Sequence, residues 1–284
     1  MNLPERSALG RRWQLASYDE RNALALAQQY QLPDVIARLL SSRGLTLENA
    51  ESFLSPSLRD QMPDPFHLLD MDKAARRLAD AVIKGEAITI FGDYDVDGAT
   101  STALLTRFFK TVGADARFYI PDRIEEGYGP NADAFKKFKD EGCNLVITVD
   151  CGIVAHDAIA EANAIGMEII VVDHHVAEAS LPPALAVVNP NRLDENSDCG
   201  NLAAVGVAFL VIVAVNKILR EAGWFTNGRF EPDLRAWLDL VALGTICDVV
   251  ALTGLNRVYV SQGLKIMGRR GNPGLAALAD AGNV

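Results

Sequence analysis

Residues 87–100 read AITIFGDYDVDGAT. The stretch begins with a short apolar run that is typical of a buried β-strand. Three aspartates, Asp93, Asp95 and Asp97, follow this run at alternate positions. Carboxylates this close repel one another unless cations neutralise them. The stretch therefore predicts a strand that ends in an acidic, cation-binding cluster.

The same order of apolar run, turn and amphipathic segment continues along the chain. Strands are expected at 87–91, 117–120, 145–149, 168–172 and 186–188, and helices at 73–83, 99–112, 132–140 and 155–164. Strands that alternate with helices and consist of continuous Ile and Val runs are typical of a parallel sheet buried on both faces. The predicted fold class is α/β, with a mainly parallel β-sheet flanked by helices.

The two ends of the chain are expected to be helical. Short helical patterns at 23–30, 33–41 and 46–53 alternate with Pro-rich loops, which predicts a small helical region over residues 1–70. Residues 71–284 then form the α/β domain, and long helices are expected near its end at 203–221, 232–249 and 257–267.

Composition indicates an ordinary globular protein without a membrane segment. Of the 284 residues, 49% are hydrophobic and 23% are charged. The longest apolar run, residues 205–215, is too short to span a bilayer. The cysteines are scattered, which favours reduced thiols in the cytoplasm over disulfides or a zinc site; they are Cys143, Cys151, Cys199 and Cys247.

The net charge of −10 argues against a generally basic nucleic-acid binder. It does not argue against a nuclease, because carboxylates that hold divalent cations form a positive site once they are loaded.

Two further expected strands end in possible metal ligands. Asp150 follows the strand at 145–149, and Asp173, His174 and His175 follow the strand at 168–172. A single Asp after a strand is ordinarily a turn or helix cap, but the carboxyl ends of parallel strands meet at one edge of the sheet. Carboxylates with imidazoles suit Mn²⁺ or Mg²⁺. Their number favours a pair of ions about 3.5–4 Å apart, as in phosphoryl-transfer sites.

Two other interpretations of the acidic motif are weaker. DVDG after a strand resembles the nucleophile motif of haloacid-dehalogenase-type phosphatases, but that mechanism needs neither Asp150 nor the DHH triplet. DxDxDG also matches the start of a calcium EF-hand loop, but its twelfth position is Leu104 where a Glu is required.

Four stretches together resemble the motifs of the DHH phosphoesterase superfamily: GDYDVDGATS (92–101), ITVDCGI (147–153), VVDHHV (171–176) and AVGVAF (204–209). The sequence around these motifs is most similar to the bacterial members of this superfamily that are 5′→3′ exonucleases specific for single-stranded DNA. The supporting stretches are PDRIEEGYG (121–129), VVNPN (187–191), NLAAVGVAFL (201–210) and DLVALGTICDVVAL (239–252). The resemblance covers residues from roughly 35 to 284.

The resemblance implies two bound Mn²⁺ or Mg²⁺ ions. The implied ligands are Asp93, Asp95, Asp97, Asp150, His174 and Asp248. Asp150 would bridge the ions. Asp97, His174 and Asp248 would share one ion with it, and Asp93 and Asp95 would bind the other. Asp248 lies in an apolar helical stretch, and its alternative role is a helix-end carboxylate that faces water.

Other residues are expected to act on the substrate or support the ligands. His175 is expected to orient neighbours or contact the scissile phosphate, beside the catalytic Asp150 and His174; its alternative is a core histidine. Asp173 is either a supporting carboxylate or a turn residue. Arg123 is a candidate phosphate contact or a solvated arginine.

Two further positions are candidate substrate contacts. Tyr128 is expected to stack on a base, or simply to pack its loop. Gly206 would permit close approach of backbone or substrate at a helix start.

The implied function is metal-dependent exonucleolytic hydrolysis of single-stranded DNA in repair and recombination. Single-strand-binding protein and helicases are implied partners, and a monomer is expected. The family's exonucleases also carry a DHHA1 lobe and an oligonucleotide-binding fold that this sequence lacks, so it is expected to be part of a longer protein.

Two alternatives to this function stay open. One is another DHH phosphoesterase, which acts on pyrophosphate, cyclic dinucleotides or short RNA. The other is a non-catalytic scaffold. The residues at all six ligand positions are acidic or His, which argues against this alternative.

Overall fold

The structure, a computed structural model, describes residues 6–226 and 228–283. Contacts divide the chain into two compact units, Met1–Ser57 and Leu58–Val284. The first unit contains α1 (Glu20–Tyr30), α2 (Asp34–Ser42) and α3 (Ala50–Leu54). Its small core consists of Leu26, Ala37, Leu40 and Ala50. The predicted helices of this region are thus present, although the third begins later than expected.

The second unit is built on a five-stranded parallel sheet. The strands are β1 (Ile88–Gly92), β2 (Ala116–Tyr119), β3 (Leu145–Val149), β4 (Glu168–Val172) and β5 (Ala186–Val188). Their order is β2-β1-β3-β4-β5, and every neighbouring pair is parallel. The chain places β2 on one side of β1 and then returns to place β3 on the other side. In open α/β sheets, this reversal leaves a crevice at the carboxyl ends of the two strands.

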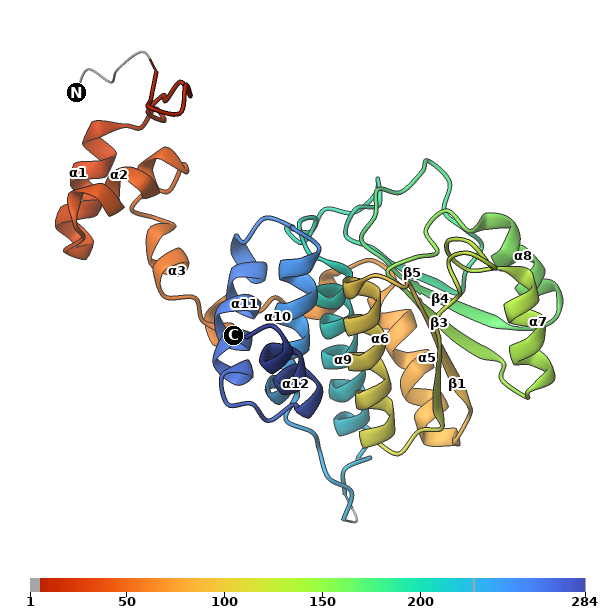
Figure 1. The fold of residues 1–284 in the computed structure, drawn as a ribbon. Helices are drawn as coiled ribbons and strands as arrows, with labels where there is room; N and C mark the ends of the chain where they lie inside the picture. Colours follow the sequence, from red (N-terminus) through yellow and green to blue (C-terminus); the bar gives the residue numbers. More distant parts are fainter. Residues whose placement is uncertain (1–5, 227, 284) are drawn as a thin grey trace. The chain divides into compact units, whose positions relative to one another are not determined.

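Helices cover both faces of the sheet, as the continuous apolar strands require (Figure 1). One face packs against α5 (Met71–Lys84), α6 (Val96–Thr111) and α9 (Ala204–Glu221), and the other against α7 (Ala132–Asp140) and α8 (His156–Ala164). Side chains of β1 alternate between them: Ile88 and Ile90 join the larger core and Phe91 the smaller one. The α/β prediction is confirmed.

The remaining helices complete the unit. They are α4 (Leu58–Gln61), η1 (Pro65–His67), η2 (Leu234–Trp237), α10 (Leu238–Cys247), α11 (Gly254–Met267) and α12 (Pro273–Ala281). Helix α10 packs against α6, α9 and α11. Among the residues that the structure describes, no helix is both long enough and apolar enough to cross a membrane.

Several boundaries differ from the sequence expectation. Helix α6 begins at Val96 instead of 99, because the Asp95 side chain accepts a hydrogen bond from Gly98 N and caps it. The helix expected at 232–249 is divided into η2 and α10 and ends at Cys247, so Asp248 is its C-cap. The division into units falls before Leu58, whose side chain packs against the larger core, rather than after residue 70.

Candidate metal centre

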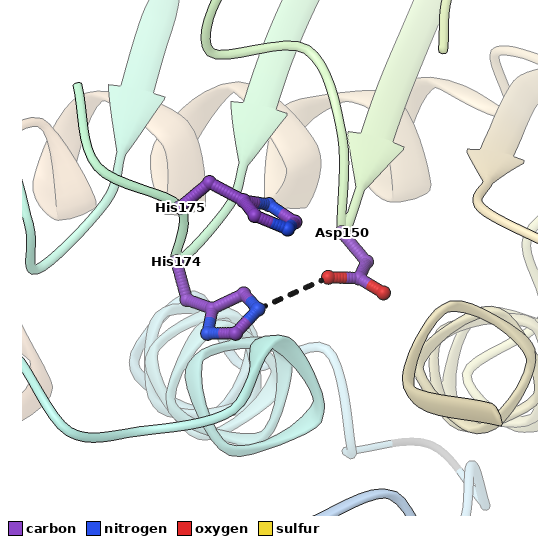
Figure 2. A group of neighbouring side chains, drawn as sticks. All are labelled: Asp150, His174 and His175. Carbon is purple, nitrogen blue, oxygen red and sulfur yellow. Dashed lines mark ion pairs between the residues drawn. The ribbon is translucent and has the colours of Figure 1, made fainter. Parts of the chain in front are cut away.

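Acidic and imidazole side chains converge at the carboxyl edge of β1, β3 and β4. The His174 ring lies at their centre, and Figure 2 shows it facing Asp150 beside His175. Its Nε2 is 3.3 Å from Asp150 Oδ1 and 3.8 Å from Asp97 Oδ2. Its Nδ1 is 3.8 Å from Asp248 Oδ2. One imidazole thus contacts carboxylates from three separate segments of the chain.

Ligand atoms of the cluster fall into three groups, each with its atoms within 4.8 Å of one another. The groups are Asp93–Asp95–Asp150, Asp97–His174–Asp248 and Asp150–His174–His175. The structure therefore brings together all six ligands that the sequence resemblance implies. Their binding of ions stays a prediction.

The start of α9 holds Asp97 in place. Asp97 Oδ2 accepts a hydrogen bond from Ala204 N at 2.6 Å, and Oδ1 accepts one from Val205 N at 2.9 Å. These amides belong to the first turn of the helix, where backbone N–H groups lack partners and the helix dipole favours negative charge. The AVGVAF motif therefore fixes an aspartate more than 100 residues away in sequence.

Close packing of α10 against α6 brings Asp248 to the site. A Cβ added at Gly244 would lie 2.8 Å from Val205 Cγ1 and 3.1 Å from Asp97 Oδ1, and closer still to Thr100 Oγ1. Only glycine permits this approach, and Asp248 lies one turn further along. Gly244 is not among the site residues expected from the sequence, although it lies in the stretch DLVALGTICDVVAL (239–252).

Asp173 fixes the turn that carries the histidines. Its side chain is fully buried. Oδ1 accepts hydrogen bonds from His174 N, His175 N and His175 Nδ1, and Oδ2 accepts one from Ile153 N. Although burial raises the pKa of Asp173, the hydrogen bond and charge of His175, together with the backbone hydrogen bonds from His175 and Ile153, outweigh it and hold the pKa below its usual range. Asp173 is thus both a turn residue and a support for His175, so the two alternatives for it combine.

The electrostatics of the cluster fit a divalent cation. Asp150 Oδ1 and Asp248 Oδ2 are buried without a hydrogen-bond partner among the described residues. Burial raises the pKa of Asp93, Asp97, Asp150 and Asp248. Burial lowers the pKa of His174, but Asp150 and the other carboxylates outweigh that and raise it. Carboxyl groups that hold protons because no counter-charge is present would lose those protons to solvent when an oxygen-preferring divalent cation binds.

Arg123 and Tyr128 approach the cluster through Tyr94. The Arg123 guanidinium lies 5.1 Å from the centre of the Tyr94 ring, which contacts the Tyr128 ring edge-on at 6.2 Å. Tyr128 Oη donates to the carbonyl oxygen of Asp150 at 3.3 Å. Tyr94 is not among the site residues expected from the sequence, although its position between Asp93 and Asp95 indicates that it lies near the cluster.

Gly206 lies apart from these residues. It is in the first turn of α9, where an added Cβ would meet the side chains of Tyr259 and Leu202. The structure gives it core neighbours, and a role in substrate binding stays a prediction.

Comparison with known proteins agrees with this arrangement. The model of the DHH family, N-terminal domain, matches residues 87–245, which include β1, β3, β4 and most of the cluster. The chain belongs to the DHH family. The match reaches Thr245 and so ends just before Asp248, the C-cap of α10.

Individual DHH-family relatives are also similar. The single-stranded-DNA-specific exonuclease RecJ of Salmonella typhimurium is 39% identical over 255 residues, which cover 89% of this chain and 44% of that protein. The manganese complex of Thermus thermophilus RecJ superposes with a TM-score of 0.75 at 31% identity, covering 94% of this chain and 36% of that one. Another exonuclease RecJ bound to manganese gives 0.66 at 38% identity, covering 75% of this chain and 52% of that one. The chain spans about half or less of these proteins.

Proposed function

We propose that this DHH-family chain carries the metal centre of an exonuclease that hydrolyses single-stranded DNA in the 5′→3′ direction, in repair and recombination. The convergence of carboxylates and imidazoles on His174, with buried oxygens of Asp150 and Asp248 left without hydrogen-bond partners, carries the proposal. The identity to relatives named as single-stranded-DNA-specific exonucleases supports the substrate.

The ligands proposed for two Mn²⁺ or Mg²⁺ ions are Asp93, Asp95, Asp97, Asp150, His174 and Asp248. When bound by these residues, two such ions would supply activation of water and neutralisation of charge on a phosphodiester. Asp150 belongs to two of the three ligand groups, which suits a bridging position. Manganese in similar solved structures supports the choice of metal.

His175 is proposed to act on the phosphate. Its Nδ1 is bonded to Asp173 at 2.7 Å, and its side chain is 48% exposed. The Asp173 hydrogen bond raises the pKa of His175. A ring held through Nδ1 can present Nε2–H to a phosphate oxygen.

Arg123, Tyr128 and Gly206 are proposed to contact the strand. Arg123 would bind a phosphate near the 5′ end, and the half-exposed Tyr128 ring would stack on a base. The contacts of Arg123 and Tyr128 with Tyr94, beside the acidic cluster, support this proposal for those two residues.

The proposed setting is the cytoplasm, with a monomer recruited by single-strand-binding protein or helicases. The described cysteines support a reducing compartment, because all four are free. Assignment of residues 71–284 to one DHH domain is part of the same proposal.

The test compares the 284-residue chain with its Asp150→Ala variant in Mn²⁺. Labelled single-stranded DNA, duplex DNA and pyrophosphate are offered, and products are resolved by size. We expect mononucleotides from 5′ ends of single strands and a loss of at least about 100-fold in the variant, because a bridging ligand is removed. Equal activity of the two proteins would overturn the proposal, and cleavage of pyrophosphate alone would favour a different DHH phosphoesterase.

A further inference from the structure

The loop that follows β5 lies against the turn that carries the two histidines. It contains Asn189 and Asn191, to which the proposed function gives no role. Asn189 Nδ2 donates to the carbonyl oxygen of His175 at 2.9 Å, and Asn191 Nδ2 donates to the carbonyl oxygen of His174. The backbone of both histidines is therefore held by asparagine side chains.

The two asparagines also hold each other. Asn189 is 1% exposed, and its Oδ1 accepts a hydrogen bond from Asn191 N at 2.7 Å. The residue between them is Pro190, whose ring fixes its φ angle. Asn191 O in turn accepts from Ala177 N at 3.4 Å, just beyond the histidines. The two loops are thus joined by hydrogen bonds in both directions.

The loop itself is fixed to the sheet by Arg192. Its Nη1 donates to Val187 O at 2.8 Å and to Asp70 Oδ2 at 3.0 Å. Asp70 Oδ2 also accepts from Val187 N, and the Arg192 side chain is only 8% exposed. Asp70 immediately precedes α5, so the loop is tied to both β5 and a core helix.

We propose that Asn189 and Asn191 are positioning residues that hold His174 at the metal centre through its backbone. The position of the His174 ring between the carboxylates depends on the orientation of its backbone, whose N–H is bonded to Asp173 and whose carbonyl oxygen is bonded to Asn191. Besides its contacts with the three carboxylates, the ring makes one hydrogen bond among the described residues, from Nδ1 to Leu202 O at 3.1 Å. This inference rests on the proposed metal centre, and it adds a function for the VVNPN stretch.

The test measures the Mn²⁺ dissociation constant of the whole chain by titration calorimetry. Asn191→Asp keeps the size of the side chain but replaces its N–H donors with a carboxylate oxygen that faces the His174 carbonyl. The matched control is Asn163→Asp, which removes a donor to Pro183 O at the opposite edge of the sheet, where α8 ends. We expect Asn191→Asp to weaken Mn²⁺ binding by roughly 10–100-fold and the control to leave it unchanged.

A double-mutant cycle separates positioning from general destabilisation. If Asn191 acts through His174, Asn191→Asp should change the remaining Mn²⁺ affinity by less than about twofold in a His174→Ala chain. Asn191→Ala, which adds no charge, should reproduce the loss in the unaltered background. Equal losses in both backgrounds, or unaltered affinity in both Asn191 variants, would overturn the inference alone. Absence of Mn²⁺ binding by the unaltered chain would overturn the metal centre as well.

Discussion

At the scale of single residues, the site contains backbone conformations that side chains rarely adopt. Asp150 has a φ of 62°, and Val249, next to Asp248, has a φ of 61°. Left-handed backbone is uncommon outside glycine, and it is most unfavourable for a β-branched residue. Such conformations cluster at functional sites, because the surrounding structure holds them. Two of the proposed ligands are thus affected: Asp150 lies in strained backbone, and Asp248 lies beside it.

Tyr94 gives a prediction at this scale. Removing its ring in Tyr94→Ala should release Arg123 and Tyr128, because the ring contacts both side chains. Cation–π and edge-on aromatic contacts are each worth about 1 kcal/mol. We expect KM for single-stranded DNA to rise about fivefold or more while kcat changes little, measured by steady-state kinetics with Mn²⁺. Tyr94→Phe keeps the ring and should behave as the unaltered chain; equal KM values for all three would contradict the prediction.

At the scale of elements, helix ends and one close helix pair build the site. Helix α6 begins within the acidic motif, α9 presents its first amides to Asp97, and Asp248 is the C-cap of α10. The α6–α10 approach depends on Gly244, whose absent side chain leaves room for Thr100 and Val205. A change in this packing would therefore move ligands on two helices together.

Gly244→Ala is expected to destabilise the fold and weaken metal binding. Overpacking of a close contact costs about 1–3 kcal/mol, which corresponds to a fall in Tm of roughly 2–4 °C per kcal/mol in a unit of this size. Mn²⁺ affinity should fall too, because the added methyl would approach Asp97 Oδ1. Gly271→Ala is the control, since an added Cβ there has no neighbour within 4 Å. Calorimetric Tm values that match in both variants would refute the expectation.

At the scale of the whole molecule, the metal-free cluster opposes folding as pH rises. The pKa values of four buried or half-buried carboxyls are raised, so the folded chain binds more protons than the unfolded chain above the ordinary carboxyl range. The raised pKa of His174 changes stability in the same direction, because the stabilising positive charge of the ring is lost at high pH. The free energy of unfolding of the metal-free chain should therefore fall as the pH rises above the ordinary carboxyl range.

Mn²⁺ should reverse this loss. At about 100 times its dissociation constant, a ligand stabilises the folded state by about 2.7 kcal/mol. The rise in Tm on adding Mn²⁺ should be larger near about pH 8 than near about pH 6, where protons compete. Asp150→Asn should melt at least as high as the unaltered chain without metal and lose most of the rise. Asp133→Asn, at a carboxylate that is 97% exposed, should retain it; a pH-independent rise in every protein would contradict the mechanism.

The sequence by itself determined the α/β class, the strands and three of the segments that carry ligands. Apolar runs such as residues 145–149 and 168–172 are local patterns, and a parallel sheet brings their carboxyl ends to one edge. Asp248 was reached only through the family resemblance, because an Asp within an apolar stretch has no local pattern that predicts its position. Helix α6 begins before its helical pattern indicates, because the Asp95 side chain caps it.

Only the tertiary structure decided how the ligands are held. The bonds of Asp97 to Ala204 and Val205, and of Asn191 to His174, join residues far apart in sequence, so no periodicity predicts them. The same is true of Gly244, whose need for glycine comes from α6 and α9 rather than from its own helix. Local chemistry decides which side chains can bind a cation, whereas long-range packing decides whether they meet.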